Sequence, residues 1–151
     1  MNLSDELTIP APRARVYEAL QDPEILRRCI PGCEELTKVS DTDLEAKVAL
    51  KIGPIKARFS GNVTLNPENP PQRFSLTGEG NGGIAGFARG GADVELEDRG
   101  EETLLRYEAK AEIGGKLAQL GSRLIQGTAK KLAGEFFGAL KTELEQTRET
   151  A

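Results

Sequence analysis

The chemistry available to this chain is narrow, because it contains no histidine and only two cysteines, Cys29 and Cys33. Without an imidazole, the chain lacks the partner of a Ser/His or Cys/His nucleophile, the commonest proton shuttle and any His-ligated metal site. Two thiols four residues apart cannot complete a four-ligand zinc site without carboxylates or a second protein chain. The sequence therefore predicts no metal, no cofactor and no catalytic constellation, and the cysteines are interpreted as plain buried or boundary thiols.

A G-x-G-x-x-G string spans residues 78–83, and this pattern can hold a dinucleotide pyrophosphate when a helix follows it. Here the string lies between two predicted strands, with no helix N-terminus beside it. Dinucleotide binding is therefore disfavoured. The glycines between residues 78 and 91 are interpreted as strand bends and bulges that leave side-chain volume empty above a sheet.

The net charge limits the classes of binding partner, and the N-terminal residues indicate the cellular compartment. The formal net charge is −4 and the pI is about 5.1, which argues against a general nucleic-acid binder, because such domains are usually basic. Asp5 and Glu6 stand where a secretory signal would carry Lys or Arg, and no apolar run approaches the ~18 residues of a spanning helix. We expect a cytoplasmic protein, with the inner face of the membrane as an alternative location.

The N-terminal part of the chain predicts a strand and two short helices. Residues 2–9 alternate apolar and polar side chains, as a half-buried strand requires. Pro12 is expected at the first helical position of the first short helix. The second is expected to begin after Asp22, whose carboxylate suits an N-cap, and to stop at Pro31.

The rest of the chain predicts strands followed by one helix. From residue 35 to residue 113 apolar residues recur at alternate positions, which predicts six antiparallel strands. At Gly114 the apolar period changes to 3.6 residues, which predicts one long C-terminal helix. The apolar faces of sheet and helix must bury each other, so we expect an α+β helix-grip fold, with a seven-stranded curved antiparallel sheet around the long helix and two short helices after the first strand. Residues 1–147 are expected to form this single domain, and residues 148–151 a frayed tail.

Several strings in the chain resemble those of one protein family. Ile9-Pro10-Ala11-Pro12, Asp22-Pro23-Glu24 and Cys29-Ile30-Pro31-Gly32-Cys33-Glu34 are similar to the opening of the CoxG family, named for the G subunit of carbon monoxide dehydrogenase. Its later signatures are similar to Gly53-Pro54-Ile55, to Gly78-Glu79-Gly80 and to Gly114-Gly115-Lys116-Leu117-Ala118-Gln119-Leu120-Gly121. The resemblance covers nearly the whole chain.

This resemblance implies a START/Bet v 1-like (SRPBCC) fold and an association with molybdenum hydroxylases of the carbon monoxide dehydrogenase type. It implies an accessory protein that acts in maturation, membrane attachment or electron-acceptor delivery, with a lipophilic quinone as the suggested ligand. Many members carry an added linker and a hydrophobic C-terminal anchor, whereas this sequence ends soon after the predicted helix. Permanent anchoring in the membrane is therefore not expected.

The inward positions of the predicted sheet are mostly alanine and glycine, so the sequence favours a cavity between sheet and helix. The alternative is that the helix packs closely and fills this space. Inward positions are almost free of charge, which favours a lipophilic ligand and carriage over catalysis. The predicted ligand-binding residues are Ile30, Phe59, Leu76, Ile84, Phe87, Ala88, Tyr107, Leu117, Leu120 and Leu124.

Two polar residues occupy positions that the alternation assigns to the inner face of the predicted sheet. Asp5 is interpreted as a residue at the rim, with a buried acid of raised pKa as the alternative. Tyr107 is expected to anchor a ligand carbonyl or cap the core rather than to donate a proton in catalysis.

Three basic residues recur every seven positions beside the apolar stripe of the predicted long helix: Lys116, Arg123 and Lys130. They suit an acidic protein patch or an anionic lipid surface at the mouth of the cavity, and a solvated face is the alternative. Lys116 is expected in the first turn of the helix, where its charge opposes the macrodipole at a cost of ~0.3 to 1 kcal/mol.

We therefore expect a non-enzymatic accessory protein of a carbon monoxide dehydrogenase-type molybdenum hydroxylase that binds a quinone-like molecule. Its expected partners are that lipophilic small molecule, the hydroxylase subunits and the surface of an anionic membrane. An assembly or membrane-recruitment factor that acts by docking is the alternative, and an aromatic cyclase or hydrolase of the same fold is a weaker one. A homodimer is left open.

Overall fold

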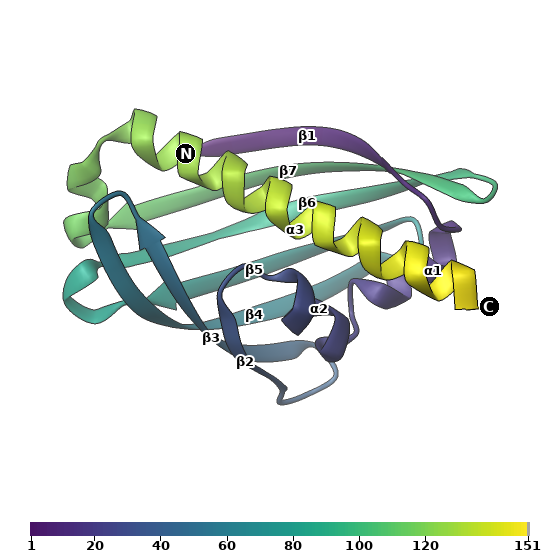
Figure 1. Ribbon diagram of the computed structural model, residues 1–151, viewed down its shortest axis with the longest axis horizontal. Coiled ribbons are helices and arrows are strands. Elements are labelled where there is room, and N and C mark those ends of the chain that lie inside the picture. The colour runs from purple at the N-terminus through teal and green to yellow at the C-terminus, as the bar shows by residue number, and fades with distance from the viewer. Residues whose placement is uncertain (151) are drawn as a thin grey trace.

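One curved sheet holds one long helix against its inner face, and two short helices close one end (Figure 1). The computed structural model describes the backbone of residues 1–150 and the side chains of residues 1–145. The elements are β1 (Asn2–Ile9), α1 (Arg13–Ala19), α2 (Pro23–Cys29), β2 (Cys33–Lys38), β3 (Asp43–Ile52), β4 (Ile55–Asn69), β5 (Arg73–Asn81), the 3-10 helix η1 (Gly83–Ala85), β6 (Phe87–Arg99), β7 (Glu102–Gly114), the 3-10 helix η2 (Gly115–Leu120) and α3 (Ser122–Thr150).

The seven strands are antiparallel in the order β1-β7-β6-β5-β4-β3-β2. The first strand closes onto the last, and Leu7 pairs with Leu105 in a register that places both side chains on the inner face. The predicted fold class is therefore confirmed. The side chains of the tail predicted at residues 148–151 lie outside the residues that the structure describes.

The two short helices follow their local sequence closely. Asp22 caps α2, because its carboxylate accepts a hydrogen bond from the backbone N–H of Glu24 at 2.9 Å. The prediction for Pro12 was wrong by one position. Pro12 is the extended N-cap of α1, and its carbonyl accepts the first helical hydrogen bond from Val16.

The predicted single C-terminal helix is divided in two. Gly121 adopts a φ of +91° between η2 and α3, a conformation that residues with a side chain rarely adopt. Lys116 consequently lies in η2, outside the first turn of α3, and the predicted dipole cost does not apply to it. The 3.6-residue period of apolar residues could not reveal this break. Over so short a stretch, a 3-10 helix and an α-helix bury side chains at similar spacings in the sequence.

The buried side chains form three clusters along the inner face. The largest joins α1, β1, β6, β7 and the later part of α3 around Ile9, Val16, Leu105 and Leu140, each with 0% exposure. A second lies between α2 and the strands β3 and β4. A third fills the opposite end of the sheet beneath η1 and η2. Between the first and second clusters, the packing leaves a cavity.

Candidate ligand cavity

A cavity of about 240 Å³ lies between the inner face of the sheet, α2 and the phenylalanines of α3. The described residues that line it are apolar or aromatic, and Tyr107 alone among them carries a polar side-chain atom. They are Leu20, Leu26, Ile30, Leu36, Leu44, Ala46, Val63, Leu65, Phe74, Leu76, Ala92, Val94, Leu105, Tyr107, Phe136 and Phe137. Such a lining suits a lipophilic molecule and offers few partners to a polar one.

The cavity adjoins a trough of about 330 Å³ on the same face of the sheet. Ala46, Val63, Leu76 and Ala92 line both hollows, so they form one continuous apolar surface. Most other inward positions of the trough are alanine or glycine, and neighbouring strands approach closely there. A Cβ at Gly78 would lie 2.8 Å from the carbonyl oxygen of Asn62, so this strand position accepts only glycine without a shift.

Tyr107 borders both the cavity and a second cleft, between α3 and β1, that Asp5 also lines. Its ring stacks on Phe137, with centroids 5.2 Å apart, and Phe136 meets Phe137 edge-on at 5.1 Å. Within residues 1–145, no side chain or backbone group forms a hydrogen bond with its hydroxyl. Burial, aided by the negative charge of Asp5, raises the pKa of Tyr107, so the hydroxyl stays protonated at neutral pH and can donate a hydrogen bond.

Asp5 is the cross-strand neighbour of Tyr107 and lies exposed at the rim of the sheet. Its carboxylate accepts a hydrogen bond from the backbone N–H of Glu6 at 2.8 Å. The structure therefore agrees with the rim interpretation of Asp5 and not with a buried acid.

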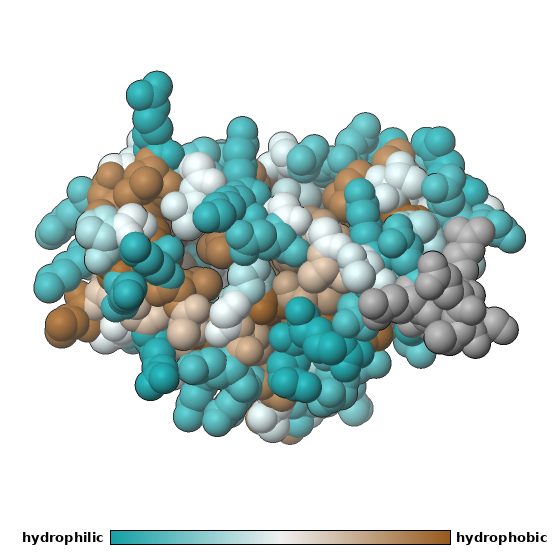
Figure 2. Space-filling model, in the orientation of Figure 1, coloured by the Kyte–Doolittle hydropathy of each residue, from teal (hydrophilic) through white to brown (hydrophobic). Residues whose placement is uncertain are grey.

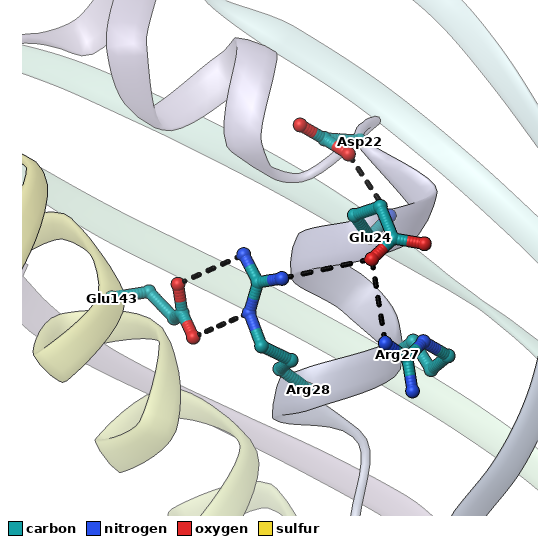
Figure 3. Close-up of polar contacts among 5 residues, drawn as sticks. All are labelled: Asp22, Glu24, Arg27, Arg28 and Glu143. Atoms are coloured by element: carbon teal, nitrogen blue, oxygen red, sulfur yellow. Dashed lines mark hydrogen bonds and ion pairs between the residues drawn. The ribbon is translucent and has the colours of Figure 1, made fainter.

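An ion-pair cluster fastens α2, one wall of the cavity, to α3 (Figure 3). Nε of Arg28 lies 2.7 Å from Glu143, and a second guanidinium nitrogen lies 3.2 Å from the same carboxylate. Glu24 accepts from Arg27 within α2 and also faces Arg28 at 3.7 Å. The hydrogen bond with Glu143 raises the pKa of Arg28 further above its ordinary value. The partners are 115 positions apart in the sequence, which explains why sequence patterns did not reveal this contact.

The two cysteines remain protonated at neutral pH. Cys29 is buried in α2, and burial, with a further effect of Glu143, raises the pKa of its thiol to about 11. Burial also raises the pKa of Cys33, whose Sγ lies 3.4 Å from the carbonyl oxygen of Glu35. Among the side chains that the structure describes, no group of Asp, Glu and Cys residues is arranged to hold a metal ion.

The structure gathers part of the predicted ligand set at this surface. Ile30, Leu76 and Tyr107 line the cavity, and Ala88 lines the trough. The sequence missed the contributions of Leu20, Leu26, Leu36 and Leu44, and also the Phe136-Phe137 pair, whose adjacent aromatic residues on the helical stripe were the available signal.

The other predicted ligand residues lie elsewhere. Phe59 and Leu117 are packed in the third cluster with Leu120 against it, and Phe87 lies under the guanidinium of Arg89. Ile84 is 85% exposed and Leu124 is 39% exposed, so the prediction that they line the cavity was wrong. The alternation of side chains along a strand identified the correct face of the sheet. It does not indicate whether a residue lies beside the cavity or farther along the same strand.

The predicted basic stripe is also divided. Lys116 lies on η2 and Arg123 on the first turn of α3, whereas Lys130 lines a separate cleft of about 500 Å³ between α3 and β1. All three side chains are exposed. They do not form one continuous stripe, because Gly121 interrupts the helix between Lys116 and Arg123.

Comparisons with known proteins agree with this geometry. Residues 6–145 match the family of the carbon monoxide dehydrogenase G subunit, CoxG. The chain belongs to the CoxG family. No functionally curated protein matches the chain. None of the helices within the described residues of this CoxG-family protein is long and apolar enough to cross a membrane.

Solved structures show the same fold. A conserved protein from Geobacillus kaustophilus is 29% identical, with a TM-score of 0.91 and 97% of each chain covered. A START superfamily protein from Mycobacterium smegmatis is 13% identical, with a TM-score of 0.75 and coverage of 97% of this chain and 98% of that one. The Zhui aromatase/cyclase from Streptomyces sp. R1128 is 12% identical, with a TM-score of 0.68 and coverage of 97% and 94%. The CoxG-family chain thus has the same fold as this START superfamily protein and this aromatase/cyclase.

Proposed function

We propose that this CoxG-family protein carries a quinone-like lipophilic molecule and serves a molybdenum hydroxylase of the carbon monoxide dehydrogenase type. The observation that carries the proposal is the apolar cavity with Tyr107 as its one polar lining residue among those described. A quinone combines an apolar ring and tail with carbonyl oxygens that accept hydrogen bonds. The description of the family supports the hydroxylase as the partner.

Tyr107 would position the ligand rather than react with it. Its hydroxyl donates a hydrogen bond to a ligand carbonyl, and Phe137, already stacked on the tyrosine ring, offers a second aromatic face. Ligand binding would remove water from this hydroxyl, and the loss costs free energy if no new hydrogen bond replaces it. A carbonyl oxygen of the ligand would provide that hydrogen bond. The raised pKa of Tyr107 keeps the proton in place at neutral pH.

Binding without catalysis is the role that these side chains support. A cyclase or hydrolase would need groups to move protons at the reacting atoms, and the described lining provides only one phenol of raised pKa. Likeness to the aromatase/cyclase concerns the fold and carries no activity to this chain.

Docking without a ligand is the second candidate function. It is favoured by one observation: a 240 Å³ cavity is smaller than the roughly 300–1,000 Å³ of typical ligand sites. In that case the protein would recruit the hydroxylase or the membrane, and lipophiles would leave its melting temperature unchanged.

A melting-temperature panel with quinones of increasing tail length separates these functions. We expect a rise in the melting temperature with a quinone and not with water-soluble aromatic acids, because a ligand that binds only the native state stabilises it. Tyr107→Phe should weaken quinone binding by roughly ten-fold, the value of about one hydrogen bond. Tyr17→Phe is the matched control, since Tyr17 packs edge-on against Phe74 without lining the cavity. Equal binding by both variants would contradict the role of Tyr107.

A further inference from the structure

Three chain connections meet at the end of the molecule opposite the C-terminus of α3 (Figure 1). They are the β3–β4 turn with its flanks (51–56), η1 with its flanks (82–87), and η2 with the start of α3 (114–124). A Cβ at Gly53 would lie 2.9 Å from Cδ2 of Leu124, and one at Gly115 would lie 2.6 Å from Cα of Gly86. The three connections therefore form one surface, called here the basic tip.

The basic tip is positively charged on an acidic protein. Its three segments contain four basic residues and no Asp or Glu, although the chain carries a net charge of −4. All four side chains are exposed, and none forms an ion pair with a residue whose side chain the structure describes. By contrast, Arg89 and Arg106 on the adjoining sheet pair with Glu112 and Glu6. The four residues are Lys51, Lys56, Lys116 and Arg123.

Apolar side chains protrude from the same surface. Ile84 is 85% exposed, Leu124 is 39% exposed, and Pro54 lies exposed in the neighbouring turn. Figure 2 shows brown, hydrophobic atoms at this end of the molecule among teal, hydrophilic ones. Ile84 packs into none of the three buried clusters, so little of its apolar surface is removed from water in the isolated protein.

We propose that the basic tip binds the surface of an anionic lipid bilayer, with its four cations among the headgroups and Ile84 at the acyl boundary. The headgroups of an anionic membrane attract cationic side chains, and the acyl boundary beneath them takes up an aliphatic side chain. A stable protein partner would instead need about 800 Å² of complementary surface on each side. The tip offers only a few protruding apolar side chains on turns.

The basic tip lies at the strand ends beyond the apolar trough, with the third buried cluster between the tip and the trough. Sheet positions Gly61, Gly78 and Gly90 of the trough lie between the cavity and the strand ends that carry the tip. Docking of the tip would bring this apolar surface toward the lipid. The membrane contact itself needs no ligand, so it and the proposed quinone binding can fail separately.

The absence of tryptophan from the sequence allows a clean test. Ile84→Trp places one reporter at the tip, and Val39→Trp places one at a 51% exposed position on the β2–β3 connection, outside the tip. With vesicles of equal parts phosphatidylglycerol and phosphatidylcholine, we expect a blue shift for the first variant and quenching of its emission by brominated acyl chains. No change is expected for the second variant, or for either with phosphatidylcholine alone.

A charge series tests the cations on the Ile84→Trp background. Each Lys or Arg changed to Gln at the tip should weaken binding to the anionic vesicles about five-fold, so the quadruple change should weaken it by more than a hundred-fold. The matched control changes four lysines outside the tip, namely Lys110, Lys130, Lys131 and Lys141. Equal responses of the two tryptophan reporters, no response of either, or equal effects of the two quadruple changes would overturn the proposal.

Discussion

A bulky side chain introduced on the inner face of the sheet distinguishes an open ligand cavity from a packed core. Ala92 lies on β6, pairs with Leu76 and Ala109, and lines both the cavity and the trough. The cavity volume of about 240 Å³ exceeds the roughly 150 Å³ that admits a benzene ring in a protein core. The ring introduced by Ala92→Phe should therefore enter the cavity and occupy the place of the ligand.

The two possibilities differ in the sign of the stability change. In a filled core, the added ring would cost ~1–3 kcal/mol through overpacking. For a chain of this length, that cost lowers the melting temperature by about 2–4 °C per kcal/mol. In an open cavity, the ring instead removes its own surface from water, which contributes up to ~1.5–3 kcal/mol. We expect the melting temperature of Ala92→Phe to stay level or rise.

The assay is thermal melting with and without a quinone. The Ala92→Phe protein should lose the quinone-dependent rise in melting temperature, whereas Ala14→Phe, an exposed position on α1, should keep it. Gly90 is unsuitable for this test, because a Cβ there would collide with the carbonyl oxygen of Lys110. A lower melting temperature together with undiminished quinone binding would refute the reasoning.

Two further predictions concern the wall of the cavity. Arg28→Gln breaks the contact between α2 and α3, so ligand release in stopped-flow fluorescence should be faster, while the unfolding free energy should change little because the pair is partly exposed. Arg27→Gln, whose partner Glu24 lies within α2, is the control, and equal release rates in both variants would show that the contact between Arg28 and Glu143 does not slow ligand release. The pKa of Cys29 is raised from about 9.0 to about 11, so its protonated form favours the native state, and this stabilisation is present below pH 9 and lost as the pH rises to 11. Urea unfolding of Cys29→Ala should show a shallower loss of stability across that range, and parallel curves would contradict the assignment.

Local patterns in the sequence were enough to predict the architecture. Strict alternation identifies strands whose one face is buried, and Asp22-Pro23 identifies the start of α2 because both residues suit a helix N-terminus. Folding of one sheet onto one helix then follows, because each has an apolar face to bury. The division at Gly121 was not predictable, since the backbone conformation of a glycine is set by its surroundings.

The site was less predictable than the fold. Parity correctly assigned Leu76 and Tyr107 to the inner face, but it could not show that Phe59 lies in a packed cluster beyond the cavity. That distinction depends on where α3 crosses the sheet. Ile84 occupies a segment that the alternation suggested was strand, whereas the structure forms a 3-10 turn there and exposes its side chain. Contacts between distant segments, such as Arg28 with Glu143, require the assembled fold.

The central claim, that the cavity carries a lipophilic molecule, is tested most directly by native mass spectrometry of the protein purified without detergent, combined with solvent extraction of whatever it holds. The account predicts one bound molecule per chain, released by organic solvent, with the mass and absorbance of a quinone, and its loss in Ala92→Phe. A chain that has the mass of the protein alone, and that takes up no quinone from anionic vesicles, would contradict it.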